Sequence, residues 1–216
     1  MDSDLESVRN LMRGSVLEIG CGSQGRRGRF QPPIGDAERW VFVDLRHGIR
    51  PTLQADTENL PFNAAEFDRV ICLEVLEYVS DPVASVIEMC RVLKSEGTLI
   101  LSCPFLHRSD TTNDRWRFTE HGLRRIIDSA GMKVECIKPQ GAALAVAVSI
   151  LRFGVSRISS RLWRNALASA FALPFKTMLA LDGTTSQNLP VLQTFSTGYL
   201  AVAVKENQTA RGQAVK

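Results

Sequence analysis

Residues 16–25 read Val16-Leu-Glu-Ile-Gly-Cys-Gly-Ser-Gln-Gly25, an apolar run that passes directly into glycines. A short apolar run of this kind predicts a buried strand, and the glycines predict a tight turn at its end. Gly20, Gly22 and Gly25 also fit the GxGxxG spacing, in which the backbone approaches a nucleoside cofactor closely. Since more than one such cofactor uses this spacing, the stretch predicts a binding turn without fixing its ligand.

Strands alternate with helices along most of the chain. Strands are expected at 15–19, 40–44, 52–56, 68–73, 97–103 and 194–204. Helices are expected at 3–12, behind a capping box of Ser3 and Glu6, from Pro82 after the N-cap Asp81, and from Thr119 to Gly131. This alternation implies a parallel sheet that is covered on both faces. Ligands bind such sheets beyond the carboxyl ends of the strands, where the glycine turn, Asp44 and Asp56 all fall.

Bulk properties bound the class of protein. With 216 residues, 44% of them hydrophobic, the chain suits one domain with an insertion. Its net charge of +3 is too small to indicate a nucleic-acid partner. The five cysteines are widely spaced and form no CxxC pair, so neither a metal site nor a disulfide framework is expected. No signal sequence or apolar membrane span is visible, so the expected location is cytoplasmic.

The residues around the turn distinguish between two cofactors. A nicotinamide dinucleotide needs a helix after the turn to hold its pyrophosphate, whereas residues 26–35 contain two glycines and two prolines. Glu18 would be costly near a pyrophosphate but suits a ligand with a cationic amino group. Asp44 could accept hydrogen bonds from two ribose hydroxyls, and Asp56 could accept one from an adenine amine. A sulfonium nucleoside, S-adenosylmethionine, therefore fits better.

These motifs resemble a known family. Val16–Gly22, Asp56–Phe62, Phe67–Val79 and Arg91–Lys94 together resemble the class I S-adenosylmethionine-dependent methyltransferases, in particular those with a type 11 methyltransferase domain. The resemblance is continuous from about residue 15 to 105. It implies a Rossmann-like three-layer αβα sandwich with a mostly parallel seven-stranded sheet, an antiparallel last strand and a helical insertion before that strand.

The resemblance also implies a set of site residues. The sequence departs from the family pattern in a third glycine, Gly25, one residue late, in a shortened or lost helix after the turn, and in Tyr78 where a histidine is common. The implied cofactor contacts are Glu18, Gly20, Cys21, Gly22, Asp44, Leu45, Asp56, Thr57, Leu73 and Glu74, the last two near the sulfonium.

The acceptor is less clearly indicated. Cys103–His107 and Asp114–Thr119 resemble a subgroup that acts on sugar, polysaccharide or lipid-linked substrates. An alcohol acceptor needs a general base, for which His107 is the first candidate and Glu74 and Glu77 are the alternatives. We expect His107, Trp116 and Arg117 to contact the acceptor. Arg26, Arg27 and Arg29 either hold an anionic acceptor or are simply solvated.

The segment 141–181 is apolar and rich in alanine, and predicts two helices. Between Glu135 and Asp182 it contains basic residues and no acidic ones. Three hypotheses follow, namely a lid, a dimer face, or peripheral contact with the inner face of an anionic membrane. The expected organisation is a methyltransferase domain at 1–140 and 190–205, an insertion at 141–189 and a flexible tail at 206–216.

Three functions remain open at this stage. The favoured one is methyl transfer to a small-molecule, sugar, glycan or lipid-linked acceptor, with oxygen as the acceptor atom. The alternatives are a nicotinamide-dependent oxidoreductase and a non-catalytic protein that binds S-adenosylmethionine. The chain is expected to be a monomer or a homodimer without a nucleic-acid partner.

Overall fold

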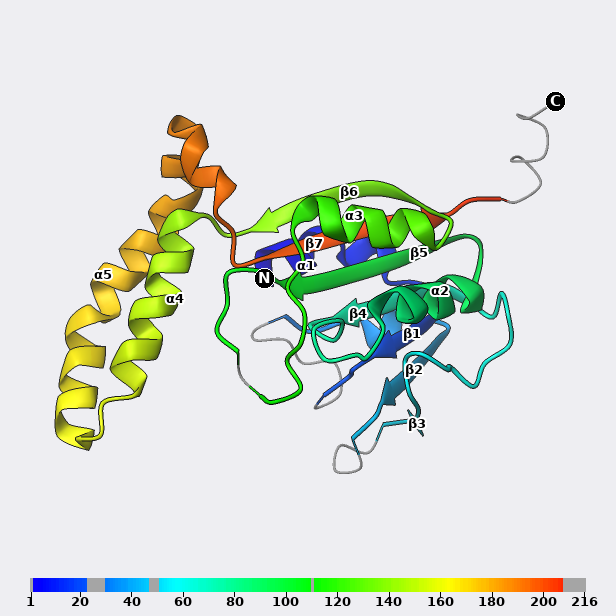
Figure 1. The fold of residues 1–216 in the computed structure, drawn as a ribbon, viewed down its shortest axis with the longest axis horizontal. Coiled ribbons are helices and arrows are strands. Elements are labelled where there is room, and N and C mark those ends of the chain that lie inside the picture. Colours follow the sequence, from blue (N-terminus) through cyan, green and yellow to red (C-terminus); the bar gives the residue numbers. More distant parts are fainter. Residues whose placement is uncertain (1, 23–29, 47–50, 110, 208–216) are drawn as a thin grey trace. The chain divides into compact units, whose positions relative to one another are not determined.

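A computed structural model describes residues 2–22, 30–46, 51–109 and 111–207 (Figure 1). Within these ranges seven strands form one sheet in the order β3-β2-β1-β4-β5-β7-β6. The sheet confirms the predicted Rossmann-like fold. The strands are β1 (Ser15–Ile19), β2 (Arg39–Asp44), β3 (Leu53–Gln54), β4 (Phe67–Leu73), β5 (Leu93–Pro104), β6 (Met132–Gln140) and β7 (Gly198–Lys205).

The central strands run parallel. β1 pairs with β2 and β4, β2 with β3, and β4 with β5, with Glu18 level with Phe42 on one side and Ile71 on the other. Their carboxyl ends consequently meet at one edge of the sheet, where the glycine turn begins. The last strand is antiparallel, as predicted. Just outside β5 and β7, the amides of Phe105 and Leu106 donate to the carbonyls of Thr197 and Ser196, in the reversed order of antiparallel neighbours.

Helices cover both faces of the sheet. On one face α1 (Asp2–Ser7) and the 3₁₀ turn η1 (Arg9–Leu11) pack a buried apolar cluster against the strands. The other face carries α2 (Pro82–Val92) and α3 (Glu120–Ser129), which contact each other (Figure 1). Burial of apolar side chains on both faces explains the nearly continuous apolar strands. The first cluster includes Leu5, Val8, Met12, Val16, Ile71, Leu73 and Ile100.

Two of the three predicted helix caps are present. Asp81 accepts hydrogen bonds from the amides of Val83 and Ala84 at the start of α2, where Pro82 has no N–H that needs an acceptor. Thr119 accepts one from the amide of Gly122 at the start of α3. Both caps use a side-chain oxygen to satisfy amides that the first helical turn leaves unpaired.

Several sequence expectations differ from the structure. The strand expected at 52–56 spans only Leu53–Gln54, both exposed at the sheet edge, so Asp56 lies in the following loop. Ser3 lies inside α1 and is not its cap. The last strand starts at Gly198, because 190–194 form a 3₁₀ turn, η3 (Pro190–Thr194). Of the segment 26–35, the part from residue 30 onward holds an isolated bridge at Phe30 and the start of the 3₁₀ turn η2 (Ile34–Asp36), and no α-helix. Residues 26–29, with Gly25, lie outside the described ranges.

The chain divides into two compact units. The first comprises Met1–Cys103, Ser109–Lys138 and Leu200–Lys216, and the second comprises Pro104–Arg108 and Pro139–Tyr199. The second unit contains the two expected helices, α4 (Ala143–Ser156) and α5 (Arg161–Asn188), which pack against each other as a hairpin (Figure 1). No helix among the described residues is long and apolar enough to cross a membrane.

Candidate functional site

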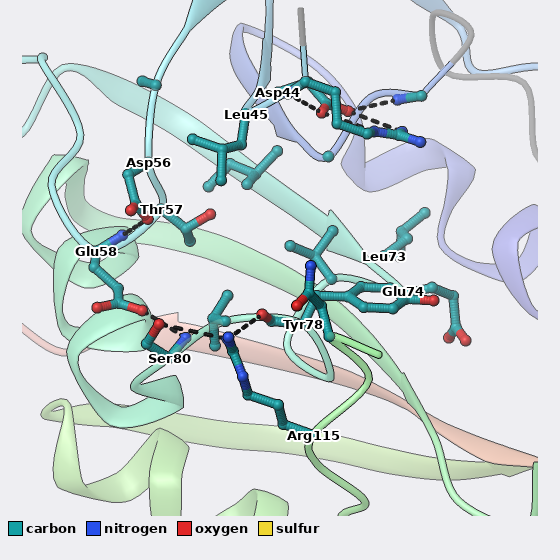
Figure 2. Close-up of a pocket in the computed structure, with 18 of the residues that line it drawn as sticks. Asp44, Leu45, Asp56, Thr57, Glu58, Leu73, Glu74, Tyr78, Ser80 and Arg115 are labelled. Atoms are coloured by element: carbon teal, nitrogen blue, oxygen red, sulfur yellow. Dashed lines mark hydrogen bonds and ion pairs between the residues drawn. The ribbon is translucent and has the colours of Figure 1, made fainter. Parts of the chain in front are cut away.

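A cavity of about 710 Å³ lies in the first unit, at the carboxyl ends of the parallel strands. In the view of Figure 2, Asp44 and Leu45 lie at one end of it and Ser80 and Arg115 at the other. This volume suits a nucleoside-sized ligand. The predicted cofactor contacts that line it are Gly20, Gly22, Asp44, Leu45, Asp56, Thr57, Leu73 and Glu74.

The glycine turn is pinned to the neighbouring strand. The amides of Gly20 and Cys21 both donate to the carbonyl of Val43, at 2.8 and 3.3 Å. Gly20 and Gly22 have φ values of 68° and 54°, which glycine adopts without steric cost. A Cβ at Gly20 would also lie 2.1 Å from Cγ2 of Val75. The turn therefore requires glycine at position 20 for both its backbone angle and the space beside it.

Asp44 is buried at the end of β2 and carries a dense set of hydrogen bonds. Its Oδ2 accepts from the amide of Gly22 at 3.2 Å, and its Oδ1 accepts from the amide of Arg46 at 3.0 Å. The Arg46 guanidinium donates to both carboxylate oxygens, at 3.2 and 3.3 Å. Burial opposes the ionisation of Asp44, but these hydrogen bonds outweigh it and lower its pKa. The group is therefore an anionic acceptor that faces the cavity.

The loop after β3 forms another wall. Asp56 accepts a hydrogen bond from the amide of Glu58 at 3.1 Å, and Thr57 is buried. The Glu58 carboxylate accepts from the amides of Ser80 and Asp81, at 2.7 and 2.9 Å, as Figure 2 shows in part. Glu58 thus joins the loop of Asp56 to the loop before α2.

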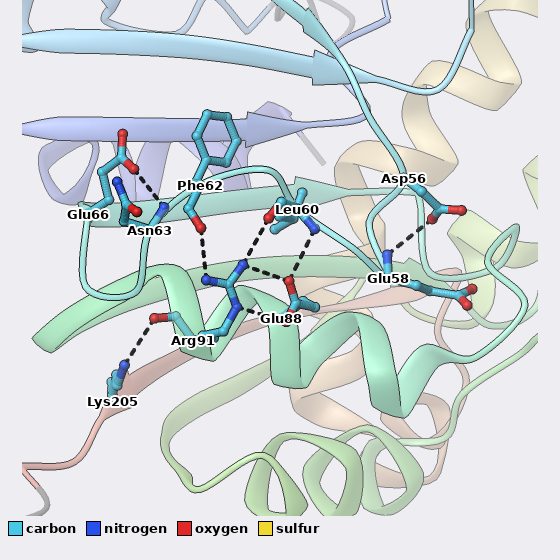
Figure 3. A network of polar contacts seen from close by, with 9 residues as sticks. All are labelled: Asp56, Glu58, Leu60, Phe62, Asn63, Glu66, Glu88, Arg91 and Lys205. Carbon is cyan, nitrogen blue, oxygen red and sulfur yellow. Dashed lines mark hydrogen bonds and ion pairs between the residues drawn. The ribbon is translucent and has the colours of Figure 1, made fainter.

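Arg91 of α2 fixes the same loop from behind (Figure 3). Its guanidinium donates to the carbonyls of Leu60 and Phe62, at 2.9 and 2.8 Å. It also pairs with Glu88, whose carboxylate accepts from the amide of Leu60 at 3.1 Å. Since three charge-assisted hydrogen bonds hold Leu60 and Phe62, the loop that carries Asp56 and Thr57 is fixed at its far end.

Glu74 stands at the end of β4 with an unusual backbone. Its φ of 56° is left-handed, which costs energy in a residue other than glycine. The Ser102 hydroxyl donates to its Oε1 at 2.8 Å, and the Glu74 amide donates to the carbonyl of Ser102 at 3.1 Å. A neighbouring residue of β5 therefore holds this carboxylate in place beside the cavity.

Glu77 is almost completely buried, with 2% of its surface exposed. Its Oε2 finds no hydrogen-bond partner among the described residues. Burial, followed by the negative charge of Glu74, raises its pKa from 4.5 to about 8. Asp114 and Arg117 form an ion pair nearby and also act on this group. Glu77 is therefore protonated at neutral pH.

Other predicted site residues do not line the cavity. The Glu18 carboxylate is buried and accepts a hydrogen bond from the indole of Trp40 at 3.0 Å. Cys21, Glu77, Trp116 and Arg117 are also absent from its wall. The Trp116 indole donates to the carbonyl of Val79, and Arg117 pairs with Asp114. His107 belongs to the second unit, where it is exposed and its Nδ1 lies 3.0 Å from the carbonyl oxygen of Arg108.

The cavity wall also contains residues that the sequence did not assign to the site. The amide of Arg115 donates to the carbonyl of Glu77 at 2.7 Å, and its side chain donates to the carbonyl of Tyr78 at 2.9 Å. These contacts bring a distant segment to the loop after β4. Glu58 could have been found, because it follows the Asp56-Thr57 pair directly. The additional lining residues include Arg46, Glu58, Tyr78, Ser80, Thr111, Asn113 and Arg115.

A Rossmann-like sheet with a glycine turn and strand-end carboxylates around one cavity is the architecture of the class I methyltransferases. Residues 17–101 match the family model of a methyltransferase domain. This match confirms, over residues 17–101, the resemblance to the S-adenosylmethionine-dependent methyltransferases that the motifs predicted.

A curated relative supports the same family. The ubiquinone biosynthesis O-methyltransferase of Xanthomonas oryzae pv. oryzae is 37% identical over 112 residues, which cover 46% of this chain and 47% of that protein. The chain thus spans about half the length of the curated relatives it matches. The similarity leaves about half of each protein unmatched.

Solved structures show the same fold at low identity. Phosphoethanolamine N-methyltransferase 2 of Haemonchus contortus, in complex with S-adenosyl-L-methionine, matches 95% of this chain and 52% of its own, with a TM-score of 0.58 and 14% identity. The [4+2]-cyclase SpnF matches 94% of this chain and 79% of its own, with a TM-score of 0.59 and 16% identity. Since one neighbour is named a methyltransferase and the other a cyclase, the fold alone does not fix the reaction.

Proposed function

We propose that this chain transfers the methyl group of S-adenosylmethionine to an oxygen atom of a small-molecule, sugar, glycan or lipid-linked acceptor. The observation that carries the proposal is that eight of the ten predicted cofactor contacts line one cavity at the strand ends. The name of the Xanthomonas relative, an O-methyltransferase, supports oxygen as the acceptor atom. The glycan or lipid-linked class rests on the motifs at 103–107 and 114–119 alone.

Each wall of the cavity has a role in this proposal. Bound S-adenosylmethionine supplies an electrophilic methyl group on a sulfonium. The Asp44 carboxylate accepts from the ribose hydroxyls, for which an anionic group with two oxygens is suited. The Asp56-Thr57 loop contacts the adenine, and the turn at Gly20 and Gly22 lets the backbone approach the amino-acid portion. These residues hold the donor, so positioning accounts for much of the rate enhancement.

The three candidate bases differ in their surroundings. Glu74 lines the cavity and has its carboxylate oriented by Ser102. Glu77 is mostly protonated at neutral pH, because burial raises its pKa to about 8, and it does not line the cavity. Glu74 is therefore the base that we favour, and His107 of the second unit stays a prediction. Turnover of Glu74→Gln, Glu77→Gln and His107→Ala at saturating donor would rank the three.

Calorimetry on the intact chain tests the proposal. We expect S-adenosylmethionine and its demethylated product to bind, and NAD not to bind. Binding of NAD without binding of the sulfonium compound would establish the oxidoreductase alternative. Transfer of labelled methyl groups into an extract of acceptors tests turnover separately. Cofactor binding without any labelled product across sugar, glycan and lipid fractions would favour a non-catalytic binding protein.

A further inference from the structure

The end of the helical hairpin in the second unit exposes large apolar side chains. This tip comprises residues 150–164, which end α4, make the turn and begin α5 (Figure 1). Exposure reaches 66% for Ile150, 77% for Leu162 and 65% for Trp163, while Leu151 and Phe153 are also exposed. Such a dense apolar cluster on a single turn is costly in water and indicates an interaction surface.

The same tip is strongly basic. Arg152, Arg157, Arg161 and Arg164 lie within its fifteen residues, and no Asp or Glu occurs from position 136 to 181. The Arg157 guanidinium stacks over the Phe153 ring at 5.0 Å, so charge and apolar surface are interleaved. The Arg164 guanidinium donates to the carbonyl of Ile158 at 3.0 Å, which ties it to the turn.

Charge selects among the possible occupants of this surface. A second copy of the tip would bring arginines against arginines, since a symmetric dimer uses the same patch on both subunits. A neutral protein groove would leave the arginines without partners. An anionic lipid surface suits both the arginines and the apolar side chains of the tip. Its headgroups pair with arginine, and its acyl boundary accepts leucine and isoleucine. Tryptophan prefers the same boundary.

We propose that the hairpin tip docks this protein onto an anionic lipid bilayer by shallow insertion of Leu162, Trp163 and Ile150. The arginines of the tip hold the headgroups. No described helix is able to span a membrane, so the contact is peripheral. A basic turn flanked by apolar residues on two helices inserts only to the depth of the headgroup boundary.

Vesicle cosedimentation of the full chain tests this contact. We expect the protein to pellet with vesicles of phosphatidylglycerol, to stay in solution with phosphatidylcholine, and to be released by high salt. Arg157→Gln with Arg161→Gln should weaken partitioning by about fivefold for each charge removed. Leu162→Ser with Trp163→Ser should abolish pelleting. Matched controls on the first unit are Arg125→Gln on α3 and Ile87→Ser on α2, both at exposed positions.

Clear outcomes would overturn the proposal. Wild-type protein that stays in solution with phosphatidylglycerol excludes it, as does equal pelleting of the tip variants and their controls. Self-association of the wild type that the Leu162 and Trp163 changes abolish, without vesicle binding, would assign the surface to a second copy. Circular dichroism confirms that each variant is folded. The assay needs neither cofactor nor acceptor, so its result stands even where the proposed methyl transfer fails.

Discussion

Arg46 and Asp44 form a closed pair at the mouth of the proposed cofactor site. The guanidinium reaches both carboxylate oxygens, at 3.2 and 3.3 Å, while the arginine side chain is 67% exposed and that of Asp44 is 5% exposed. The same two oxygens are the ones that we assign to the ribose hydroxyls. Cofactor binding therefore requires Arg46 to share or release its partner.

Asp44→Asn should weaken binding of S-adenosylmethionine by about 10- to 100-fold. Asparagine keeps the shape of the side chain but removes the charge and one acceptor oxygen, and hydrogen bonds to charged groups contribute about 1.5–3 kcal/mol each. Titration calorimetry measures the change. Asp128→Asn, at an exposed position on α3, is the control and should bind as the wild type does. An unchanged Kd in Asp44→Asn would remove this residue from the site.

Arg46→Gln should change affinity in the opposite direction. Because the Arg46 side chain is largely exposed, the ion pair contributes about 1 kcal/mol, so freeing Asp44 should tighten cofactor binding by about fivefold. Because salt screens the pair, the difference between variant and wild type should shrink as ionic strength rises. A weaker affinity in Arg46→Gln would show instead that the guanidinium itself contacts the cofactor.

Gly20→Ala should destabilise the protein and weaken cofactor binding together. The left-handed φ of 68° costs an alanine about 1–2 kcal/mol, and its Cβ would meet Val75 Cγ2 at 2.1 Å. Val75 also lines the cavity, so its displacement changes the site. Urea denaturation and calorimetry measure both effects. Gly35→Ala, where an added Cβ has no neighbour within 4 Å, is the matched control; equal losses in the two variants would refute the steric argument.

Glu77 should make stability fall as pH rises. Below about pH 4.5 the carboxyl is protonated in both the folded and the unfolded chain, so it has no effect. Between about pH 4.5 and pH 8 the unfolded chain loses a proton that the folded chain keeps, which lowers the free energy of unfolding progressively. The full loss is at most about 5 kcal/mol, since one pKa unit corresponds to about 1.4 kcal/mol.

Glu77→Gln should remove this dependence. The amide stays neutral, and its NH₂ group can donate to the nearby carboxylates, so the variant should be more stable than the wild type at pH 8 and similar to it at pH 4. Thermal melts across this range measure the difference. Glu38→Gln, at an exposed loop position, should leave the wild-type profile unchanged. A Glu77→Gln profile parallel to that of the wild type would mean that Glu77 is already ionised.

The sequence predicted the centre of the sheet and one half of the site. β1, β2 and β4 are short apolar runs because they are buried on both faces, and the residues that follow such runs necessarily meet at one edge. This reasoning placed Gly20 and Asp44 at the cavity, whereas Leu73 was implied by the family resemblance. It overestimated the third strand, because Leu53 and Gln54 lie at the sheet edge and their exposure leaves no distinct pattern.

The other half of the candidate site depends on contacts between segments that are far apart in the sequence. Arg115 reaches the cavity because its amide and side chain bond to carbonyls of the loop after β4, a docking that no local pattern encodes. The same docking directs the Trp116 indole to the carbonyl of Val79, although its aromatic character had suggested an acceptor wall. Glu18 fits the cofactor motif, yet its carboxylate bonds to Trp40 on the neighbouring strand.

Asp182 of α5 caps the start of α4 from forty residues away. Its Oδ2 accepts from the amide of Ala142 at 2.6 Å, and its Oδ1 accepts from the amides of Leu144 and Ala145, at 3.0 and 3.2 Å. Ala142 occupies the N-cap position and has no side-chain oxygen that could accept a hydrogen bond from these amides. The buried Asp182 carboxylate of α5 therefore accepts hydrogen bonds from the backbone amides at the start of α4.

Asp182→Ala should consequently open the helical hairpin without unfolding the first unit. Three amides would lose their acceptor, at a cost of about 1–3 kcal/mol for each group that stays buried. Hydrogen exchange should show faster exchange in α4, while the amides of β1 and β4 exchange at the wild-type rate. Asp182→Asn should have a smaller effect, because its remaining oxygen still accepts. The control Asp128→Ala removes an exposed carboxylate from α3, and α4 exchange that is equally slow in both alanine variants would disprove the cap.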